Sequence, residues 1–415
     1  MHILLINHYA GSVRHGMEYR PYYLAREWVR LGHHVHIVAA SHSHVRSQAP
    51  ELQGRDRLDE TIDGIAYTWF ATPAYQGSGF SRVLNILAFV SRLFRESKSL
   101  ACTATPDVVI ASSTYPLDIF PARRIARLAK ARLLFEVHDL WPLSPMELGG
   151  YSRWHPFILL LQAAENQACR YADAIVSMLP KVAEHLQKHG MAPHKLHIVP
   201  NGADPAEWVP NTPEAPAALS TRLAHFRSSG TFIVGYAGSH GTANALGNLI
   251  DAARLLRDAP VAFVLVGSGS EKTALQQRAA ALGLSKVHFF DAIAKTQIPA
   301  FLRDIDLAYI GWKLQPLYRF GISPNKLIDY MMSGRPILHA VEAGNDLVAE
   351  SRCGMTVEPE NPRAVADGIA SLMALPPETR AAMGQRGRQF ALDQLSYPVL
   401  GQRFLNILSG EANHG

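Results

Sequence analysis

The chain has 415 residues, of which 48% are hydrophobic and 18% charged, a balance that indicates a globular protein of two or three domains and excludes a disordered or fibrous one. Its three cysteines, Cys102, Cys169 and Cys353, are too few for a disulfide framework and lack the CxxC spacing of a zinc knuckle, so we expect a reducing cytoplasm. The net charge of +5 comes entirely from residues 1–202, with 21 Lys and Arg against 16 Asp and Glu, and so small an excess disfavours nucleic acid and favours an anionic substrate or an anionic lipid surface.

Short apolar runs alternate with helix-length periodic segments through residues 1–202, the pattern of a parallel sheet flanked by helices. The first run lacks the basic flank and cleavage site of a signal peptide, so we expect it to be a buried strand. No run of about 18 apolar residues predicts a membrane span. The predicted strands of this half are residues 2–7, 35–39, 108–111, 133–137, 174–177 and 197–199.

Residues 80–98 form a different kind of segment. Apolar residues recur there at helical spacing, and Arg82, Arg92, Arg95 and Lys98 lie among them, which predicts an amphipathic basic helix. Such a helix either covers the core or lies on anionic lipid, and the sequence leaves both open.

Residues 203–230 contain several prolines and few periodic apolar positions, which predicts a linker. A second strand and helix series follows. Two doubly wound α/β domains, residues 1–202 and 203–392, would leave a cleft between them, a common place for a ligand. The strands predicted in the second half are residues 232–236, 262–266, 286–290, 307–310, 336–339 and 355–357.

The most specific motif is the run 324–336, PNKLIDYMMSGRP, a short apolar helix that ends at a glycine and leads into a strand. It resembles the donor-site helix of GT-B glycosyltransferases of family 4. Further runs resemble other motifs of that family in the same order: FEVHD at 135–139, VPNGAD at 199–204, IVGYAGSHG at 233–241 and LVGSGSE at 265–271. The runs NHY at 7–9 and GMEYRP at 16–21 resemble a WbuB-like bacterial subgroup that adds N-acetyl-fucosamine-type sugars to surface polysaccharides.

The resemblance implies a GT-B fold, two Rossmann-like domains facing a central cleft, with a last helix in residues 393–415 that crosses back to the first domain. It implies a retaining, metal-independent transfer without a cofactor, from a UDP-sugar, an N-acetyl-deoxyhexose such as N-acetyl-fucosamine, to a polyprenyl-diphosphate-linked saccharide in O-antigen, capsule or exopolysaccharide synthesis. We then expect a cytoplasmic protein at the inner face of the cytoplasmic membrane, its first domain toward the lipid. A UDP-sugar 2-epimerase of the same architecture and a sugar-nucleotide-binding protein remain alternatives.

Donor binding is expected at the ends of the strands in the second half. A glycine-rich turn between strand and helix lets the backbone approach a diphosphate. The family's usual Arg and Lys on this turn are missing, so we expect Lys326, one helical turn before Asp329, to neutralise the leaving group, with Arg319 and Lys313 as alternatives. By resemblance Asp329 bonds the ribose. The predicted donor-binding residues are Gly238, Ser239, His240, Gly241, Asn244, Gly267, Ser268, Ile293, Ser323, Pro324 and Asn325.

In the first half, the resemblance places His138 beside the transferred sugar, near the reacting carbon. A structural histidine at a strand end is the alternative, and Asp139 either orients the ring or caps the next turn. Gly16, Glu18, Tyr19 and Arg20 are predicted to bind the acceptor, or else to form a capped amphipathic helix.

Three patterns are not interpreted as sites. Asp304-Ile305-Asp306 has the spelling of a metal-binding DxD motif but lies between a helix and a buried strand, where acids cap and link. The histidines at 33, 34, 36, 42 and 44 are divided by strand alternation. The run 267–269 lacks the third glycine of a dinucleotide fingerprint, so an NAD enzyme is a remote alternative.

Overall fold

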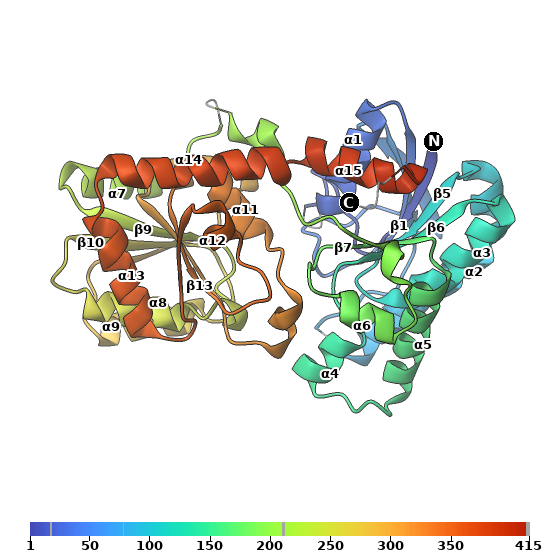
Figure 1. The fold of residues 1–415 in the computed structure, drawn as a ribbon, viewed down its shortest axis with the longest axis horizontal. Helices are drawn as coiled ribbons and strands as arrows, with labels where there is room; N and C mark the ends of the chain where they lie inside the picture. The colour runs from blue at the N-terminus through green and yellow to red at the C-terminus, as the bar shows by residue number, and fades with distance from the viewer. Residues whose placement is uncertain (17–18, 78, 210–211, 412–415) are drawn as a thin grey trace. The chain divides into compact units, whose positions relative to one another are not determined.

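The computed structural model describes residues 1–16, 19–77, 79–209 and 212–411. The chain forms two compact units: Met1–Pro200 with Tyr397–Gly415, and Asn201–Ser396 (Figure 1). Each unit is a mostly parallel sheet with helices on it, so the two predicted doubly wound α/β domains are confirmed. Every one of the twelve predicted strands forms, within one residue at either end. No described helix is both long and apolar enough to cross a bilayer.

The first unit is built on an eight-stranded sheet with the order β3-β4-β2-β1-β5-β6-β7-β8, parallel except for β3, which runs antiparallel to β4. Its central strands β1, β5 and β6 are almost wholly buried, as expected where helices cover both faces. The strands are β1 (His2–Ile6), β2 (His34–Ala40), β3 (Arg57–Ile62), β4 (Ile65–Phe70), β5 (Val108–Ala111), β6 (Arg132–Val137), β7 (Ala174–Ser177) and β8 (Leu196–Ile198).

The hairpin β3–β4 was not predicted. Its outer strand is polar and only Ile62 in it is buried, so it lacks a clear apolar alternation. The signal that could have found it is the two-residue turn Asp63-Gly64, where both residues have positive φ, 50° and 80°, as the tight hairpin turns of antiparallel strands require.

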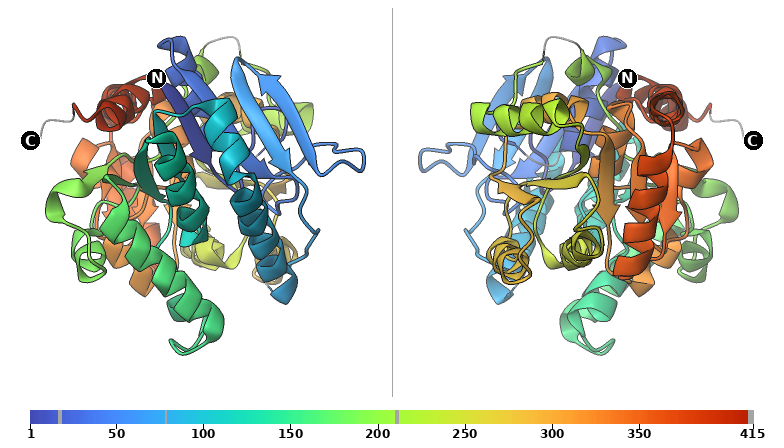
Figure 2. Two further views of the ribbon diagram at one scale, coloured as in Figure 1. Left: turned by 90° about the vertical axis from the view of Figure 1, so that its right-hand side faces the viewer. Right: turned by 90° about the vertical axis from the view of Figure 1, so that its left-hand side faces the viewer.

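The helices of the first unit pack around this sheet, and α2, α3 and α5 lie side by side on one face (Figure 2, left). The last helix, α15, packs on α1: the indole of Trp28 donates to the Gly401 carbonyl at 3.1 Å, and the rings of Tyr23 and Tyr397 stack at 4.7 Å. The helices are α1 (Tyr19–Arg30), α2 (Phe80–Ala104), α3 (Ile119–Ala129), α4 (Leu143–Gly149), α5 (Pro156–Tyr171), α6 (Ala183–Lys188) and α15 (Tyr397–Ser409), with 3-10 turns η1 (Pro116–Asp118) and η2 (Pro193–Lys195).

The second unit is a six-stranded, wholly parallel sheet with the order β11-β10-β9-β12-β13-β14. Its strands are β9 (Phe232–Ala237), β10 (Val261–Val266), β11 (Val287–Phe290), β12 (Leu307–Gly311), β13 (Ile337–Ala340) and β14 (Gly354–Val357). Its helices are α7 (Ala217–Ser228), α8 (Leu246–Leu255), α9 (Lys272–Ala281), α10 (Ile298–Arg303), α11 (Asn325–Met332), α12 (Leu347–Ser351), α13 (Pro362–Ala374) and α14 (Pro377–Gln394), with 3-10 turns η3 (Pro205–Trp208), η4 (Thr242–Asn244), η5 (Lys295–Gln297) and η6 (Pro316–Phe320).

The prediction of a linker over residues 203–230 was wrong for most of its length. Helix α7 occupies residues 217–228 and buries Leu219, Leu223 and Phe226 in the core of the second unit. These three positions have the i, i+4, i+7 spacing of one helical face, a signal that the surrounding prolines and polar residues obscured.

Candidate active site

A pair of glycine turns lies at the carboxyl ends of the neighbouring strands β9 and β10. Gly238 and Gly267 have φ of +150° and +152°, in the region that favours glycine. A Cβ on Gly267 would lie 1.9 Å from the Gly238 carbonyl oxygen, so the two turns pack backbone against backbone. The His240 N–H donates to the Ser268 carbonyl at 2.7 Å. The structure therefore brings the predicted donor residues Gly238, His240, Gly267 and Ser268 together at one sheet edge, where open α/β sheets bind ligands.

Lys326 reaches this edge from the first turn of α11. Its ammonium donates to the Tyr236 hydroxyl and to Asn244 Oδ1, both at 2.7 Å, and a Cβ on Gly238 would lie 2.6 Å from its Cε. Burial lowers the pKa of Lys326 to about 7. At neutral pH the side chain is therefore only partly charged in this poorly solvated place, and an anion bound beside the glycine turn would stabilise its charged form.

His240 is fully buried between the turns, and neither of its ring nitrogens has a hydrogen-bond partner among the described residues. Burial, with the nearby charges of Lys272 and Lys326, lowers its pKa to about 4, so the imidazole is neutral. Buried polar atoms in native proteins are rarely left unpaired unless a ligand or water satisfies them. The ring thus offers one donor and one acceptor at the glycine turns.

The backbone around the turns is held by the predicted residue Asn244 and by three side chains that were not predicted, Tyr236, Tyr330 and Lys272. The Tyr236 hydroxyl and the Asn244 amide both donate to the Ser239 carbonyl, at 2.7 and 2.9 Å. The Tyr330 hydroxyl accepts from the Ala237 N–H at 2.8 Å, which fixes α11 to the end of β9. Lys272 donates to the Gly267 carbonyl at 3.0 Å, from the turn that opens α9. Buried tyrosines on a strand and helix read as core residues in a sequence, and only the fold shows that their hydroxyls face this edge.

The remaining predicted donor residues lie at the ends of neighbouring elements. Gly241 precedes η4, and α8 begins two residues after Asn244. Pro324 is the residue before α11 and Asn325 its exposed first residue. The Ser323 hydroxyl accepts from the Asn201 N–H at 2.8 Å, so part of its hydrogen bonding is used within the unit. Ile293 follows β11 and packs on the core.

Asp329 lies one turn beyond Lys326 on α11, a spacing that places both on the same helix face. Burial raises the pKa of its carboxyl to about 6, a shift that Lys295 opposes and Glu207 reinforces. Hydroxyl groups that donate to the Asp329 carboxylate would stabilise its ionised form in these buried surroundings, since hydrogen bonds to the charged form favour that form.

In the first unit, Glu136 forms a buried polar network at the end of β6. Arg20 donates to its Oε1 at 2.9 Å, the Ser112 hydroxyl donates to its Oε2 at 2.6 Å, and His138 Nε2 lies 3.2 Å from Oε2. Burial alone would raise the pKa of Glu136, but Arg20, His138 and Ser112 outweigh it and hold the pKa at about 2. In the sequence Glu136 stands out only as part of the run FEVHD at 135–139; in the structure it is the permanent anion beside His138.

Asp139 does not orient the His138 ring in this arrangement. Its Oδ1 accepts from the Leu140 N–H and the Ser144 hydroxyl, at 2.8 and 2.7 Å, so it caps the turn before α4, the second of the two roles expected for it.

The predicted acceptor residues that the structure describes, Gly16, Tyr19 and Arg20, have different surroundings. Glu18 lies outside the described residues. Arg20 is buried and donates, besides Glu136, to the Val199 and Pro200 carbonyls at 2.8 and 2.5 Å, which favours a role in positioning Glu136 over contact with a substrate. Tyr19 is half-buried beside the Tyr23 ring, and Gly16 has φ of +65° with its Cα against Ser47.

Asp304 and Asp306 have the capping and linking roles that the sequence predicts for them. Asp304 forms an ion pair with Arg227, and Asp306 accepts from the Ile233 N–H at 2.8 Å, which joins the loop before β12 to β9. Two histidines of the group at 33–44 bond to different partners. His36 Nε2 bonds to the Thr68 hydroxyl, and His44 Nδ1 bonds to the Tyr75 hydroxyl.

Comparison with known families gives two matches that together span most of the chain. Residues 14–207 match the model described as Glycosyltransferase Family 4, and residues 231–374 match the model described as Glycosyl transferases group 1.

Individual proteins give the same result. The chain is 25% identical over 395 residues to the putative colanic acid biosynthesis glycosyl transferase WcaI of Escherichia coli K12, covering 92% of this chain and 94% of that protein. It is 24% identical over 296 residues to the probable glycosyltransferase WbjE of Pseudomonas aeruginosa, covering 70% and 72%. The fold is similar to that of HepE from Anabaena in complex with UDP, with a TM-score of 0.71 and 18% identity, over 99% of this chain and 100% of that one.

Proposed function

The chain belongs to the family 4 glycosyltransferases, with two Rossmann-like units of the GT-B fold, and from this premise we propose that it is a retaining enzyme of bacterial surface-polysaccharide synthesis. In this proposal a UDP-sugar, an N-acetyl-deoxyhexose such as N-acetyl-fucosamine, is the donor and a polyprenyl-diphosphate-linked saccharide the acceptor. The printed names of WcaI and WbjE support the polysaccharide, and the UDP bound to HepE supports the nucleotide. The observation that carries the proposal is Lys326 held against the Gly238 turn beside the unpartnered His240.

The chemistry that this site would perform is stabilisation of a departing diphosphate. When the bond between the anomeric carbon and phosphate breaks, negative charge develops on the UDP oxygens. Preorganised cations and N–H donors aimed at that charge are usually the largest catalytic contribution. Lys326 would supply the cation, in place of a metal ion, and the backbone N–H groups of Ser239 and Gly241 the donors, since those of Gly238 and His240 bond to the Val266 and Ser268 carbonyls.

The remaining steps use the other predicted residues. The Asp329 carboxylate would accept from the ribose hydroxyls and so fix the nucleotide along α11. The Glu136 carboxylate, 3.2 Å from His138 Nε2, would hold the ring in place, and the ring would contact the transferred sugar near the reacting carbon. The acceptor hydroxyl would attack on the face from which UDP leaves, and a phosphate oxygen would take its proton. That sequence retains the configuration of the sugar without a protein nucleophile.

We also propose that the first unit lies on the cytoplasmic face of the membrane. One face of α2 packs into the core through Ile86, Phe89 and Leu93, so the core-covering alternative describes that face. Its other face exposes large apolar side chains, and so does the region from α4 to α5. The exposed residues are Phe80, Leu84, Leu87 and Phe94 on α2, and Leu148, Tyr151, Trp154, Leu159 and Leu160 around α4 and α5. With Arg95 and Lys98 beside them, they offer both the apolar and the cationic contact of an interfacial surface.

The test is UDP release from a panel of UDP-sugars, with and without a short polyprenyl-diphosphate-GlcNAc acceptor and in the presence of EDTA. We expect release from one donor only when the acceptor is present. Conversion of a UDP-sugar to an isomer without acceptor would instead identify an epimerase, and tight UDP-sugar binding without either reaction would identify a binding protein. Loss of activity in EDTA, restored by a metal ion, would overturn the assignment of the cation role to Lys326.

A further inference from the structure

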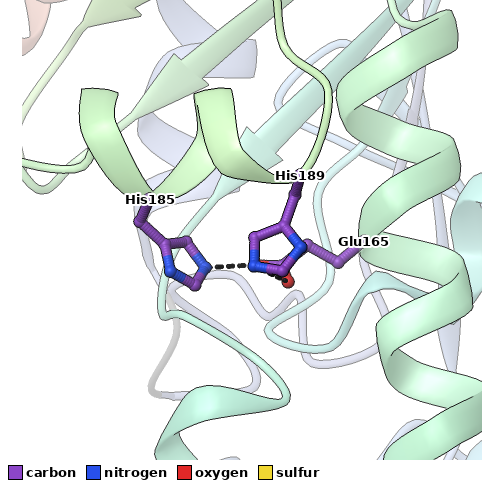
Figure 3. A group of neighbouring side chains, drawn as sticks. All are labelled: Glu165, His185 and His189. Carbon is purple, nitrogen blue, oxygen red and sulfur yellow. Dashed lines mark hydrogen bonds and ion pairs between the residues drawn. The ribbon is translucent and has the colours of Figure 1, made fainter.

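Three side chains of the first unit converge at a place that the proposed reaction does not use. Glu165 extends from the middle of α5, His185 lies in α6, and His189 is the residue that ends α6. Figure 3 shows both imidazole rings turned toward the Glu165 carboxylate. Their ligand atoms all lie within 4.8 Å of one another, the one such group of His, Cys, Asp and Glu side chains in the part of the chain that the structure describes.

The distances fit a single small cation. His185 Nε2 lies 2.8 Å from Glu165 Oε1, and His189 Nε2 lies 3.8 Å from Oε2. In a tetrahedral zinc site, ligand bonds of about 2.0–2.2 Å place neighbouring ligand atoms roughly 3.4 Å apart. The observed separations, one to each carboxylate oxygen, lie on either side of that value, so small side-chain rotations would bring one ligand atom of each residue around a single ion.

The hydrogen bonds around His189 leave a free lone pair on its Nε2, which lies on the side of the Glu165 carboxylate. The Gln162 amide has two hydrogens, and Glu165 Oε2 and Asn166 Oδ1 lie 2.8 and 3.1 Å from its nitrogen. The same nitrogen also lies 2.9 Å from His189 Nδ1, but Asn166 Oδ1, at 2.9 Å from Nδ1, can only accept, so with both Gln162 hydrogens on the two oxygens it is His189 that donates to Asn166. In the neutral ring Nε2 is then the nitrogen without a proton, and it lies on the side of the Glu165 carboxylate. Metal-bound histidines use this same device, a donor bond from the second nitrogen to a neighbouring acceptor.

The charge of the cluster points the same way. The Glu165 side chain is only 3% exposed, and within the described residues its ion pairs are with the two histidines alone, with no lysine or arginine. A buried carboxylate needs a compensating cation. The histidine side chains are 12% and 24% exposed, so an ion from solvent can reach the site.

We propose that Glu165, His185 and His189 bind a divalent transition-metal ion of the zinc type, with a water molecule in the fourth position. Two imidazoles and a carboxylate are ligands that Zn²⁺ accepts readily, and four-residue spacing puts both histidines on one side of α6. The ion joins α6 to α5 and is a structural site, separate from the sugar-transfer chemistry.

The test is calorimetric titration of Zn²⁺ into the full-length, tag-free protein after dialysis against chelator. We expect one ion per chain, with an affinity that falls at least tenfold in His185→Gln and in His189→Gln and is lost in the double variant. His225→Gln, which removes an exposed histidine from α7, is the matched control and should bind as the wild type does.

Two further readouts keep the test independent of folding defects. Co²⁺ added to the wild type should give the strong visible absorption of a four- or five-coordinate site, absent from the double variant, while circular dichroism shows that the variant is folded. Zn²⁺ should raise the melting temperature of the wild type and not that of the double variant. Unchanged Zn²⁺ binding in the folded double variant, or no stoichiometric binding by the wild type at micromolar concentration, would overturn the proposal.

Discussion

Lys326 is the residue on which the site depends most. Its ammonium is held by Tyr236 and Asn244 beside the Gly238 turn, so it is positioned before any ligand binds. Loss of one preorganised donor to developing charge commonly costs on the order of a hundredfold or more in turnover. We expect that loss in Lys326→Ala, measured as acceptor-dependent UDP release. Lys181→Ala, at an exposed position, should retain wild-type turnover, and equal turnover in both variants would remove Lys326 from the mechanism.

The pKa of Lys326 makes a separate prediction about protons. At pH 8.5 a lysine with a pKa near 7 is mostly neutral, and a bound diphosphate raises that pKa, so binding draws a proton from solution. Calorimetry of UDP binding in two buffers of different ionisation enthalpy should therefore show uptake of close to one proton per UDP. In Lys326→Met the uptake should vanish. Uptake that persists in this variant would assign the proton to another group.

Asp329 links binding to stability through its raised pKa. The folded-state value of about 6 exceeds the ordinary value of 3.8, so between those pH values the folded state holds the proton more tightly, and stability falls as pH rises through this window. Asp329→Asn removes that cost. It should raise the free energy of unfolding at pH 7 by roughly 1–3 kcal/mol while weakening UDP binding. Denaturant unfolding and calorimetry measure the two effects, and unchanged UDP affinity would contradict the ribose assignment.

Residue identity at the site was predictable where a motif carried it. Lys326 and Asp329 follow from the run 324–336, and the glycines from their place after strands. The partners of Lys326 were not predictable, because Tyr236 and Asn244 reach it across 90 and 82 residues of sequence. The burial of His240 and the placement of Arg20 beneath Glu136 likewise depend on long-range packing, which one sequence does not display.

At the scale of elements, the two strand-to-helix turns act as one piece because Gly267 touches the Gly238 carbonyl. Gly267→Ala adds a methyl group with no room and a φ of +152° that alanine resists, so we expect a loss of more than about 1 kcal/mol of stability together with weaker UDP binding. Gly247→Ala in α8 is the control. Its nearest neighbour would be Arg278 at 3.9 Å, and a helical alanine should stabilise the protein slightly. Chemical unfolding of both variants makes the comparison, and equal stability would contradict the close contact.

Helix α2 carries the membrane prediction. Each cation near an anionic surface contributes about 1 kcal/mol of attraction, so replacing Arg92 and Arg95 by Glu should weaken binding to phosphatidylglycerol vesicles at least tenfold. The Arg92→Lys/Arg95→Lys variant keeps the charge and should cosediment as the wild type does. Arg92 also pairs with Asp56, so circular dichroism must show that the Glu variant is folded. Unchanged cosedimentation of the Glu variant would leave α2 with its core-covering role only.

Element prediction succeeded for strands buried on both faces, because continuous apolar runs bounded by turns identify them. It failed for β3, which has one polar face and owes its place to the Asp63-Gly64 turn and to pairing with β4. It failed too for α7, whose three buried residues provide the helical signal within an otherwise polar, proline-bounded segment. In the hairpin the turn and the neighbouring strand decide the structure, and in α7 packing into the core of the second unit does.

At the scale of the whole molecule, the architecture followed from the alternation of strands and helices, and the family from motifs spaced along nearly the whole chain. The alternation of strands and helices does not identify the sugar. Recognition of the sugar depends on side chains that are neither repeated nor regularly spaced in the sequence. The excess of positive charge in residues 1–202 belongs to the same unit as the exposed apolar face of α2, so the proposed membrane contact would use both.

The return of α15 to the first unit bears on how the protein is made. Residues 201–396 are in effect an insertion within a unit that both ends of the chain complete. Trp28 and Tyr23 on α1 stay uncovered until Tyr397, Phe404 and their neighbours emerge from the ribosome. Domains fold as they are synthesised, at about 5–20 residues per second. The second unit can therefore finish folding before the first. While residues 201–396 are being made, which takes roughly ten seconds or more, the first-made part of the chain is the one open to chaperones and to aggregation.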